Sequence, residues 1–349
     1  MEKQKIIISK DLCQSLTQAI DEVKHDLLFV LCDETTERLC LPVISDFECV
    51  RGAQLITIPA TDTHKTLESL SHVWSELQRM GATRHSLMVN LGGGMVTDLG
   101  GFAASTFKRG IPYINIPTTL LSMVDASVGG KTGINFLGLK NEIGVFNNAK
   151  SVILDTEFLK TLDTENMLSG YAEMLKHGLI NDAKMLGELL SFDIEHPDLE
   201  QLKRMVAESV AVKQRIVTED PTEKGIRKAL NLGHTAGHAF ESFALKHNPV
   251  LHGYAVAWGL IVELYLSAIK TGFPTDKMRQ TVRFILDHYG KMNITCDDYP
   301  TLLELMTHDK KNIAGIINFT LLGGVGDILI DQTATKEEIY EAFDFYRES

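Results

Sequence analysis

One segment indicates the fold of the first half of this chain: Leu91-Gly92-Gly93-Gly94-Met95-Val96-Thr97-Asp98. It follows an apolar run over 86–90 that predicts a buried strand, and it opens a stretch that predicts a helix. Glycines at such a turn let a diphosphate approach the backbone N–H groups at the positive end of the helix. The segment is therefore a candidate nucleotide loop. Its spacing is not Gly-x-Gly-x-x-Gly, and a tight turn without a ligand is the alternative.

Short apolar runs on both sides of this segment predict a mostly parallel α/β sheet. The predicted strands are 27–31, 55–58, 86–90, 113–116 and 152–154, with a helix over 67–80. From residue 163 the pattern becomes helical, with predicted helices over 166–180, 199–217, 228–243, 254–270 and 276–289. A hairpin is expected over 316–330, with its turn at Gly323-Gly324, before a last helix. We expect an α/β domain over 1–160 and a mainly helical domain over 161–349.

Composition excludes several classes of function. The chain has 349 residues, with 34 Lys and Arg against 46 Asp and Glu, which gives a net charge of −12. Such a charge disfavours nucleic acid and anionic membranes as partners. The longest apolar segment, 254–269, contains Glu263 and predicts a buried helix and no membrane span. Five cysteines without a Cys-x-x-Cys pair, and no secretory leader, favour a reducing, cytoplasmic location.

Histidines and a carboxylate in the second half form a candidate metal site. His234 and His238 are four residues apart, so a helix places both imidazoles on one face. Glu173 lies in an otherwise apolar helical stretch, and His252 precedes the long apolar segment. Two histidines and a carboxylate with an open position suit a catalytic zinc. The alternatives are hydrogen-bonded core histidines and an ion pair between Glu173 and Lys176 or a neighbouring helix.

Cations near polar or glycine-rich turns form a second candidate group. The turn from Asp125 to Thr132 ends in Gly-Lys-Thr but lacks the first glycine of a P-loop, which disfavours a nucleoside triphosphatase. If the cations meet in one cleft, they would attract a small polyanionic substrate; otherwise they are ordinary surface residues. They are Arg109, Lys131, Lys140, Lys176, Lys213, Arg227, Lys310 and Lys311.

Taken together, these motifs resemble the 3-dehydroquinate synthase family over essentially the whole chain. The matching strings include Gly92–Asp98, Gly101–Gly110, Pro117-Thr118-Thr119, Val124–Thr132, Lys140-Asn141, Tyr171–His177, Asn231–His238 and His252-Gly253. The resemblance implies an NAD-binding α/β domain, a helical domain with a catalytic divalent metal (Zn²⁺ or Co²⁺), a sugar-phosphate substrate and a homodimer.

The resemblance also implies roles for individual residues. The metal falls on Glu173, His234 and His252, so that His238 faces the substrate. The NAD contacts fall on Asp62, Lys65, Gly93, Gly94, Met95, Asp98, Thr118, Thr119, Asp125, Lys131, Lys140, Phe158 and Thr161. The substrate pocket falls on Arg109, Asp125, Lys131, Asn141, Lys176, Lys213, Arg227, Asn231, His238, Lys310 and Lys311, with Arg109 reaching the neighbouring subunit's site.

Two segments depart from the family's pattern. Thr61-Asp62-Thr63-His64-Lys65 stands where the family commonly has Gly-Glu-x-x-Lys, so the carboxylate expected to contact the adenosine ribose is one methylene shorter. Phe136-Leu137-Gly138-Leu139-Lys140 stands where Pro-Leu-Gly-Lys is usual, which displaces the glycine by one position. Both departures affect the expected cofactor contacts.

The implied reaction converts 3-deoxy-D-arabino-heptulosonate 7-phosphate into 3-dehydroquinate and phosphate. NAD oxidises the substrate transiently, phosphate leaves by β-elimination, NAD is regenerated, and ring opening with an aldol closure completes the carbocycle. The alternatives are a sister cyclase of the 2-deoxy-scyllo-inosose or epi-valiolone synthase type, a metal-dependent polyol dehydrogenase, and a non-catalytic NAD-binding regulator. The expected substrate pocket favours the dehydroquinate reaction over all three.

Overall fold

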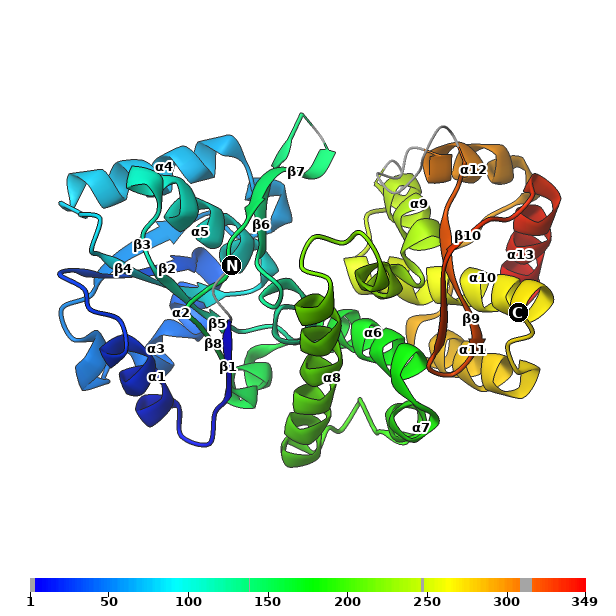
Figure 1. Ribbon diagram of the computed structural model, residues 1–349, viewed down its shortest axis with the longest axis horizontal. Coiled ribbons are helices and arrows are strands. Elements are labelled where there is room, and N and C mark those ends of the chain that lie inside the picture. The colour runs from blue at the N-terminus through cyan, green and yellow to red at the C-terminus, as the bar shows by residue number, and fades with distance from the viewer. Residues whose placement is uncertain (1–3, 138, 246–247, 308–315) are drawn as a thin grey trace. The chain divides into compact units, whose positions relative to one another are not determined.

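Six parallel strands form the main sheet of the N-terminal region, in the order β1-β8-β5-β4-β2-β3 (Figure 1). The computed structural model describes residues 4–137, 139–245, 248–307 and 316–349. Its contacts divide the chain into unit 1, residues 1–163 and 199–210, and unit 2, residues 164–198 and 211–349. The strands of this sheet are β1 (Lys5–Ile8), β2 (Leu28–Asp33), β3 (Gln54–Ile58), β4 (Leu87–Gly92), β5 (Tyr113–Pro117) and β8 (Ser151–Leu154).

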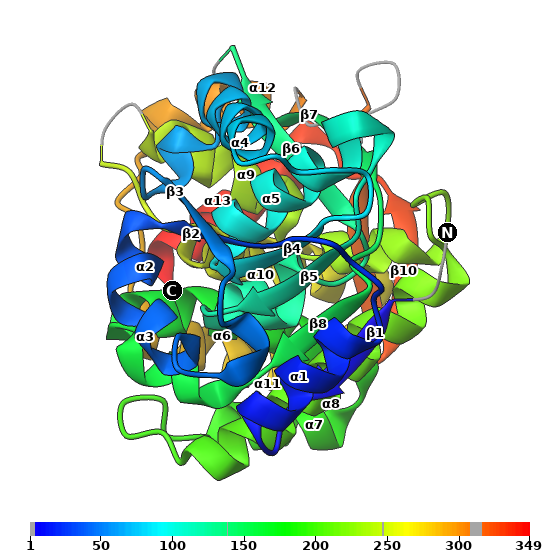
Figure 2. The same ribbon diagram turned by 90° about the vertical axis from the view of Figure 1, so that its left-hand side faces the viewer.

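Helices cover both faces of this sheet (Figure 2). Helices α4 and α5 lie on one face, and α1 and α3 lie on the other, so strands such as β4 and β8 are buried along their whole length. This explains why these strands read as continuous apolar runs. The helices of unit 1 are α1 (Leu12–Asp21), α2 (Glu34–Leu39), α3 (Leu41–Ile44), α4 (Leu67–Arg79) and α5 (Gly94–Thr106). The mostly parallel α/β prediction is confirmed.

A separate antiparallel hairpin, β6 (Lys131–Phe136) and β7 (Leu139–Phe146), also belongs to unit 1. Every residue of β7 is exposed, whereas Thr132, Gly133 and Ile134 of β6 are buried. Short helical turns complete the unit at η1 (Glu48–Val50), η2 (Asp62–His64), η3 (Phe107–Arg109), η4 (Ser122–Ala126) and η5 (Thr156–Thr161).

Unit 2 is helical and is built around α10, which packs against α6, α9, α11, α13 and β9. Helix α10 is long and apolar enough to cross a membrane by length and composition, and most of it is buried inside the unit, as in a core helix. The helices are α6 (Thr164–Asn181), α7 (Ala183–Ser191), α9 (His234–Ala244), α10 (His252–Thr271), α11 (Thr275–Tyr289), α12 (Tyr299–Thr307) and α13 (Lys336–Glu348). The remaining elements are α8 (Leu199–Glu219), which begins in unit 1, η6 (Ile226–Asn231), η7 (Cys296–Asp298), and the hairpin of β9 (Phe319–Gly324) and β10 (Asp327–Gln332).

The structure corrects two sequence predictions and contains elements that were not predicted. The helix expected over 228–243 is interrupted: η6 ends at Asn231, Gly233 has a φ of +79°, and α9 starts afresh at His234. The late hairpin turns at Gly326, with a φ of +84°, and not at Gly323-Gly324, which belong to β9. Strand β1, the β6–β7 hairpin, α7 and α12 were not predicted.

Candidate active site

The turn between β4 and α5 is shaped by its glycines. Gly93 is the N-cap residue of α5 and has no side chain with which to cap the helix. A Cβ on Gly93 would lie 3.1 Å from the Thr119 side chain, and a Cβ on Gly94 would lie 3.2 Å from Ala126. The predicted cofactor residues Gly93, Gly94 and Thr119 are therefore together, at the carboxyl ends of β4 and β5. Met95 follows in the first turn of α5, where backbone N–H groups suit a diphosphate.

Two further predicted cofactor residues form an ion pair. Lys65 Nζ lies 2.5 Å from Asp98 Oδ2, and the two side chains are 4% and 17% exposed. Burial raises the pKa of Asp98, and the charge of Lys65 opposes that rise. The charges of Asp62 and Asp125, both predicted cofactor residues, also raise the pKa of Asp98.

A buried thiol connects two predicted threonines. The hydroxyls of Thr161 and Thr118 interact with the Cys40 thiol and partly offset the rise that burial causes in its pKa. Thr161 also donates a hydrogen bond of 2.7 Å to the carbonyl of Phe158, whose ring is fully buried in η5. Thr118, Phe158 and Thr161 thus share one region of unit 1 with Cys40, for which no role was predicted.

The two segments that depart from the family's pattern meet each other. Lys140 Nζ lies 3.7 Å from Asp62 Oδ2. Asn135 connects them further, because its amide donates to the Asp62 carbonyl at 3.1 Å and its Oδ1 accepts from the Asn141 N–H at 3.0 Å. Asn141 adopts a φ of +51°, in the left-handed region. The β6–β7 hairpin is thereby fixed to the loop that carries Asp62.

Three predicted substrate residues of unit 1 are exposed, namely Arg109, Lys131 and Asn141. Lys131 begins β6, opposite Phe146 of β7. Arg109 ends η3 with a φ of +69°, beside Lys108 with a φ of +49°. Two consecutive left-handed residues other than glycine are uncommon, and they set the direction of the Arg109 side chain.

The predicted metal ligands of unit 2 lie within reach of one ion. Glu173, His234 and His252 each offer a ligand atom, and these atoms lie within 4.8 Å of one another. Glu173 Oε1 is 3.3 Å from His234 Nε2 and 3.5 Å from His252 Nε2. Lys176, one turn along α6, forms an ion pair with the other carboxylate oxygen of Glu173. Both alternatives considered for Glu173, a metal site and a pair with Lys176, are compatible with this arrangement.

The electrostatics of this cluster favour an ionised carboxylate. Burial raises the pKa of Glu173, but the charges of Lys176 and His234 lower it further, to well below its usual range. Burial, followed by the charge of Lys176, lowers the pKa of His234 to about 4. Burial also acts to lower the pKa of His252, but the carboxylates Glu241 and Glu173 outweigh it and raise that pKa to about 10.

A second group of possible ligands shares His252. His238, Glu241 and His252 also offer atoms within 4.8 Å of one another, and Glu241 Oε2 lies 3.5 Å from His252 Nδ1. Glu241 is buried and was missed in the sequence, where the only signal is its position three residues after His238 on the same helix. A carboxylate on the far nitrogen of a metal-binding histidine commonly orients the ring.

The remaining predicted substrate residues of unit 2 include three buried cations. Lys176, Lys213 and Arg227 are 1%, 6% and 2% exposed. Arg227 donates to the Pro221 carbonyl at 2.8 Å, and the amide of Asn231 donates to Glu223 at 2.9 Å. Lys310 and Lys311 lie outside the described residues.

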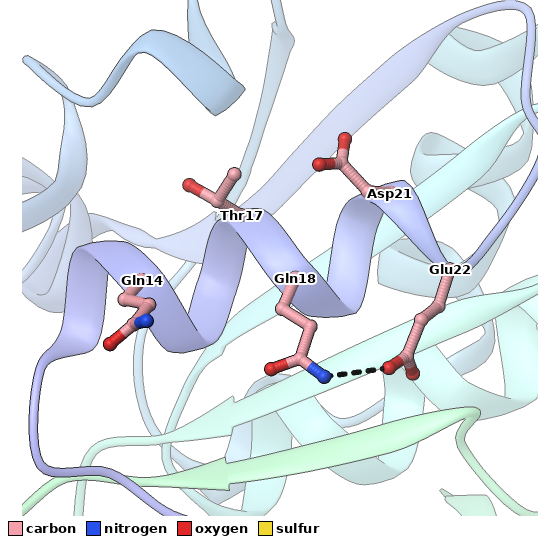
Figure 3. A pocket seen from close by; sticks show the side chains of 5 residues that line it. All are labelled: Gln14, Thr17, Gln18, Asp21 and Glu22. Carbon is pink, nitrogen blue, oxygen red and sulfur yellow. Dashed lines mark hydrogen bonds between the residues drawn. The ribbon is translucent and has the colours of Figure 1, made fainter.

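A shallow surface hollow lies on α1 and is lined by Gln14, Thr17, Gln18, Asp21 and Glu22 (Figure 3). Gln18 donates a hydrogen bond of 3.0 Å to Glu22 there. The hollow contains none of the predicted site residues.

Comparison with known proteins identifies relatives over the whole chain. The model of the 3-dehydroquinate synthase N-terminal region matches residues 55–169, and that of the C-terminal region matches residues 170–312. The chain is 54% identical to a 3-dehydroquinate synthase from Parabacteroides distasonis, over 100% of this chain and 99% of the relative. It is 38% identical to a 3-dehydroquinate synthase from Pyrococcus furiosus, over 95% of this chain and 96% of the relative.

Solved structures share the fold. A 2-epi-5-epi-valiolone synthase from Streptomyces hygroscopicus, with NAD⁺ and Zn²⁺ bound, has a TM-score of 0.86 and 25% identity, covering 100% of this chain and 98% of that one. A 2-deoxy-scyllo-inosose synthase, complexed with carbaglucose-6-phosphate, NAD⁺ and Co²⁺, has a TM-score of 0.83 and 23% identity, covering 98% and 96%.

Proposed function

Because this chain belongs to the 3-dehydroquinate synthase family, we propose that it converts 3-deoxy-D-arabino-heptulosonate 7-phosphate into 3-dehydroquinate and phosphate. The observation in the structure that carries the proposal is the meeting of Glu173, His234 and His252, which come from three separate helices of unit 2. A polyol dehydrogenase and a non-catalytic NAD-binding regulator are not supported by the family match.

The residues present fit a divalent cation. His234 Nδ1 lies 3.1 Å from the Leu232 carbonyl, so its proton is assigned there and Nε2 carries a lone pair. That lone pair faces Glu173 Oε1 at 3.3 Å, and this oxygen is buried without a hydrogen bond. Two acceptors facing each other in a buried site repel unless a cation lies between them. Histidine nitrogens with a carboxylate suit Zn²⁺ or Co²⁺.

NAD and the metal would divide the chemistry between them. When bound, NAD supplies a reversible two-electron oxidation, and the metal acts as a Lewis acid on a substrate oxygen. NAD would bind to Gly93, Gly94, Met95 and the other predicted cofactor residues of unit 1. The metal would bind to Glu173, His234 and His252 of unit 2. The proposed assignment is thus NAD to the domain over 1–160, and metal and substrate to the domain over 161–349.

The chain's own residues would bind the substrate and hold its charge. Lys176, Lys213 and Arg227 are buried cations, and a buried cation stabilises a phosphate more strongly than an exposed one because water screens it less. Lys176 also keeps Glu173 ionised and therefore able to act as a ligand. His238 lies beside His234 on α9, with ring centroids 5.3 Å apart, and we assign it to the substrate.

Assembly and location follow the same family reading. We expect a homodimer in which Arg109 reaches the neighbouring subunit's site, and a cytoplasmic location. Analytical ultracentrifugation of the purified chain measures the first, and an Arg109→Ala variant with reduced turnover and an unchanged assembly state would support the role of Arg109.

The decisive experiment measures phosphate release from 3-deoxy-D-arabino-heptulosonate 7-phosphate with NAD and zinc supplied, while NADH absorbance is followed and the carbocyclic product is identified. We expect phosphate and 3-dehydroquinate to form without accumulation of NADH. Release from sedoheptulose 7-phosphate or glucose 6-phosphate, and not from this substrate, would instead identify a sister cyclase. Stoichiometric NADH from a simple polyol would contradict the cyclase proposal altogether.

A further inference from the structure

Helix α9, which carries His234 as its first residue, begins at a residue that cannot cap it. Gly233 is the N-cap residue, with a φ of +79°, and it has no side chain to accept a hydrogen bond. A Cβ at this position would lie 2.8 Å from the Leu260 side chain and 3.1 Å from the Val256 carbonyl oxygen. A serine, threonine or aspartate, the usual N-cap residues, therefore does not fit here.

A carboxylate from the neighbouring helix caps α9 instead. Glu263 lies in the otherwise apolar middle of α10 and is fully buried. Its Oε2 accepts the Gly233 N–H at 2.6 Å, and its Oε1 accepts the Ala236 N–H at 3.1 Å. These are the N-cap and N3 donors, the two that a capping box satisfies with two local side chains. Here both are satisfied by one side chain from another helix.

The same two helices also touch backbone to backbone. A Cβ on Gly259 would overlap the Gly233 carbonyl oxygen and would lie 2.6 Å from the Gly237 nitrogen. Gly259 is one helical turn before Glu263 on α10, so the close approach brings the carboxylate to the start of α9. Helix α10 also carries His252 as its first residue. Helix α10 therefore supplies one candidate metal ligand, His252, and holds Gly233, which is next to another candidate ligand, His234.

We propose that Glu263 is a positioning residue, which sets His234 against His252 by anchoring the first turn of α9 to α10. A buried carboxylate is costly unless several donors and a positive field stabilise it, and the N-terminus of α9 provides both. A leucine at this position would fill the same core space but would leave two buried N–H groups without this acceptor. This inference rests on the proposed function, because it assigns the metal to His234 and His252.

The test compares zinc affinity in the full-length protein and in Glu263→Gln. Glutamine keeps the shape but replaces one of the two accepting oxygens with an NH₂ group, so one of the two N–H groups would face a donor. We expect zinc, measured by competition with a chelating dye, to bind about tenfold more weakly, at the low end of the roughly 10–100-fold loss seen for groups that orient ligands. Excess zinc should restore most of the turnover, and the KM for NAD should not change.

A matched control removes a helix cap that is distant in sequence from the candidate metal ligands. Thr335 caps α13 by accepting the Glu338 N–H at 3.2 Å. Thr335→Ala should lower the melting temperature while zinc affinity stays within about twofold of the unaltered chain. If Glu263→Gln lowers the melting temperature in the same way and binds zinc as tightly as the unaltered chain, the role of Glu263 is only structural and the proposal is wrong.

Hydrogen exchange on the unaltered chain covers the case in which Glu263→Gln does not fold. The amides of Gly233 and Ala236 should exchange as slowly as those in the middle of α9, even after zinc is removed by a chelator. Rapid exchange at these two amides without zinc would overturn the proposal, because it would mean that Glu263 does not hold the start of α9. An unaltered chain that binds no zinc at all would contradict the proposed function instead.

Discussion

Glu173 lies in the interior of unit 2, and the neighbouring groups determine whether its carboxylate is ionised. Burial alone would favour the protonated acid, whereas Lys176 and His234 favour the carboxylate and prevail. At neutral pH the side chain is therefore an ionised ligand. Substitution of Glu173 should also affect Lys176, which is 1% exposed, because the Glu173 carboxylate neutralises the buried Lys176 charge.

Glu173→Gln should lose both the metal and stability. We expect less than about one-tenth of the zinc per chain, turnover lower by at least about 100-fold, and a free energy of unfolding lower by roughly 3 kcal/mol because Lys176 is left as a buried charge. Zinc content by atomic absorption, initial rates and urea unfolding measure the three effects. A variant that retains full zinc would mean that Glu173 is not a ligand.

The Lys65–Asp98 pair in unit 1 allows a double-mutant test. Lys65→Met should lower the free energy of unfolding by about 3 kcal/mol at pH 7, because it leaves a buried carboxylate without its cation. The folded-state pKa of Asp98 is already raised and should rise further without Lys65. A raised carboxyl pKa gives stability at low pH that is lost as the pH rises through it, so the defect should shrink as the pH is lowered.

The double variant Lys65→Met/Asp98→Leu removes both charges from this pair. It should recover to within about 1 kcal/mol of the unaltered chain, since replacing a whole buried pair by apolar groups is often neutral. Urea unfolding of the single and double variants at pH 5 and pH 7 measures both effects. A double variant as unstable as the sum of the single variants would show that the residues do not act as a pair.

Helices and strands were predicted correctly from the local sequence pattern where their burial is uniform. Strand β4 is buried at all six positions, and its apolar run predicted it to within two residues. Strand β1 is only four residues long and partly exposed, and β7 is exposed throughout, so neither shows a buried face in its pattern. The break before α9 was missed because its cause, the approach of α10 to Gly233, lies outside the local sequence.

Helix α13 begins with a capping box whose carboxylate also contacts α10. Glu338 accepts the Thr335 N–H at 2.7 Å and forms an ion pair with Lys270 at 2.8 Å. The hydrogen bond from Lys270, followed by that from Thr335, lowers the pKa of Glu338. A lowered carboxyl pKa gives stability that is present above the unfolded pKa and is lost as the pH falls through the folded one.

Glu338→Gln should therefore cost roughly 0.5–1 kcal/mol of stability at pH 7, and less at pH 4, just below the unfolded-state value of about 4.3. Urea unfolding of unit 2, followed by the fluorescence of Trp258, measures the difference at the two pH values. An equal cost at both would mean that packing, and not charge, is responsible.

At the scale of the whole molecule, the sequence predicted the sheet, the helical second half and the family. It did not predict how residues 173, 234 and 252 meet, because periodicity shows which face of a helix is apolar and not what that face contacts. The family resemblance pointed to these three residues, and the structure shows them in reach of one ion. Glu241 and Glu263 became visible as site neighbours only in three dimensions.

Each unit contains one tryptophan, so the unfolding of each unit can be followed by the fluorescence of its own tryptophan. Trp74 donates to the Ala103 carbonyl in unit 1, and Trp258 donates to the Gly290 carbonyl in unit 2. In Trp74→Phe, zinc at about 100 times its dissociation constant should raise the free energy of unfolding by about 2.7 kcal/mol, and NAD should do the same in Trp258→Phe. Zinc that stabilises only the unit reported by Trp74 would contradict the ligand assignment.

The position of β1 at the edge of the sheet has a consequence for biosynthesis. Its pairing partner is β8, so Ile6, Ile7 and Ile8 find Val152, Ile153 and Leu154 only after most of unit 1 has been translated. At about 5–20 residues per second, the ribosome leaves the first strand waiting for roughly 7–30 s. During that interval the nascent chain exposes three consecutive isoleucines, and transiently exposed apolar surface of this kind is prone to aggregation.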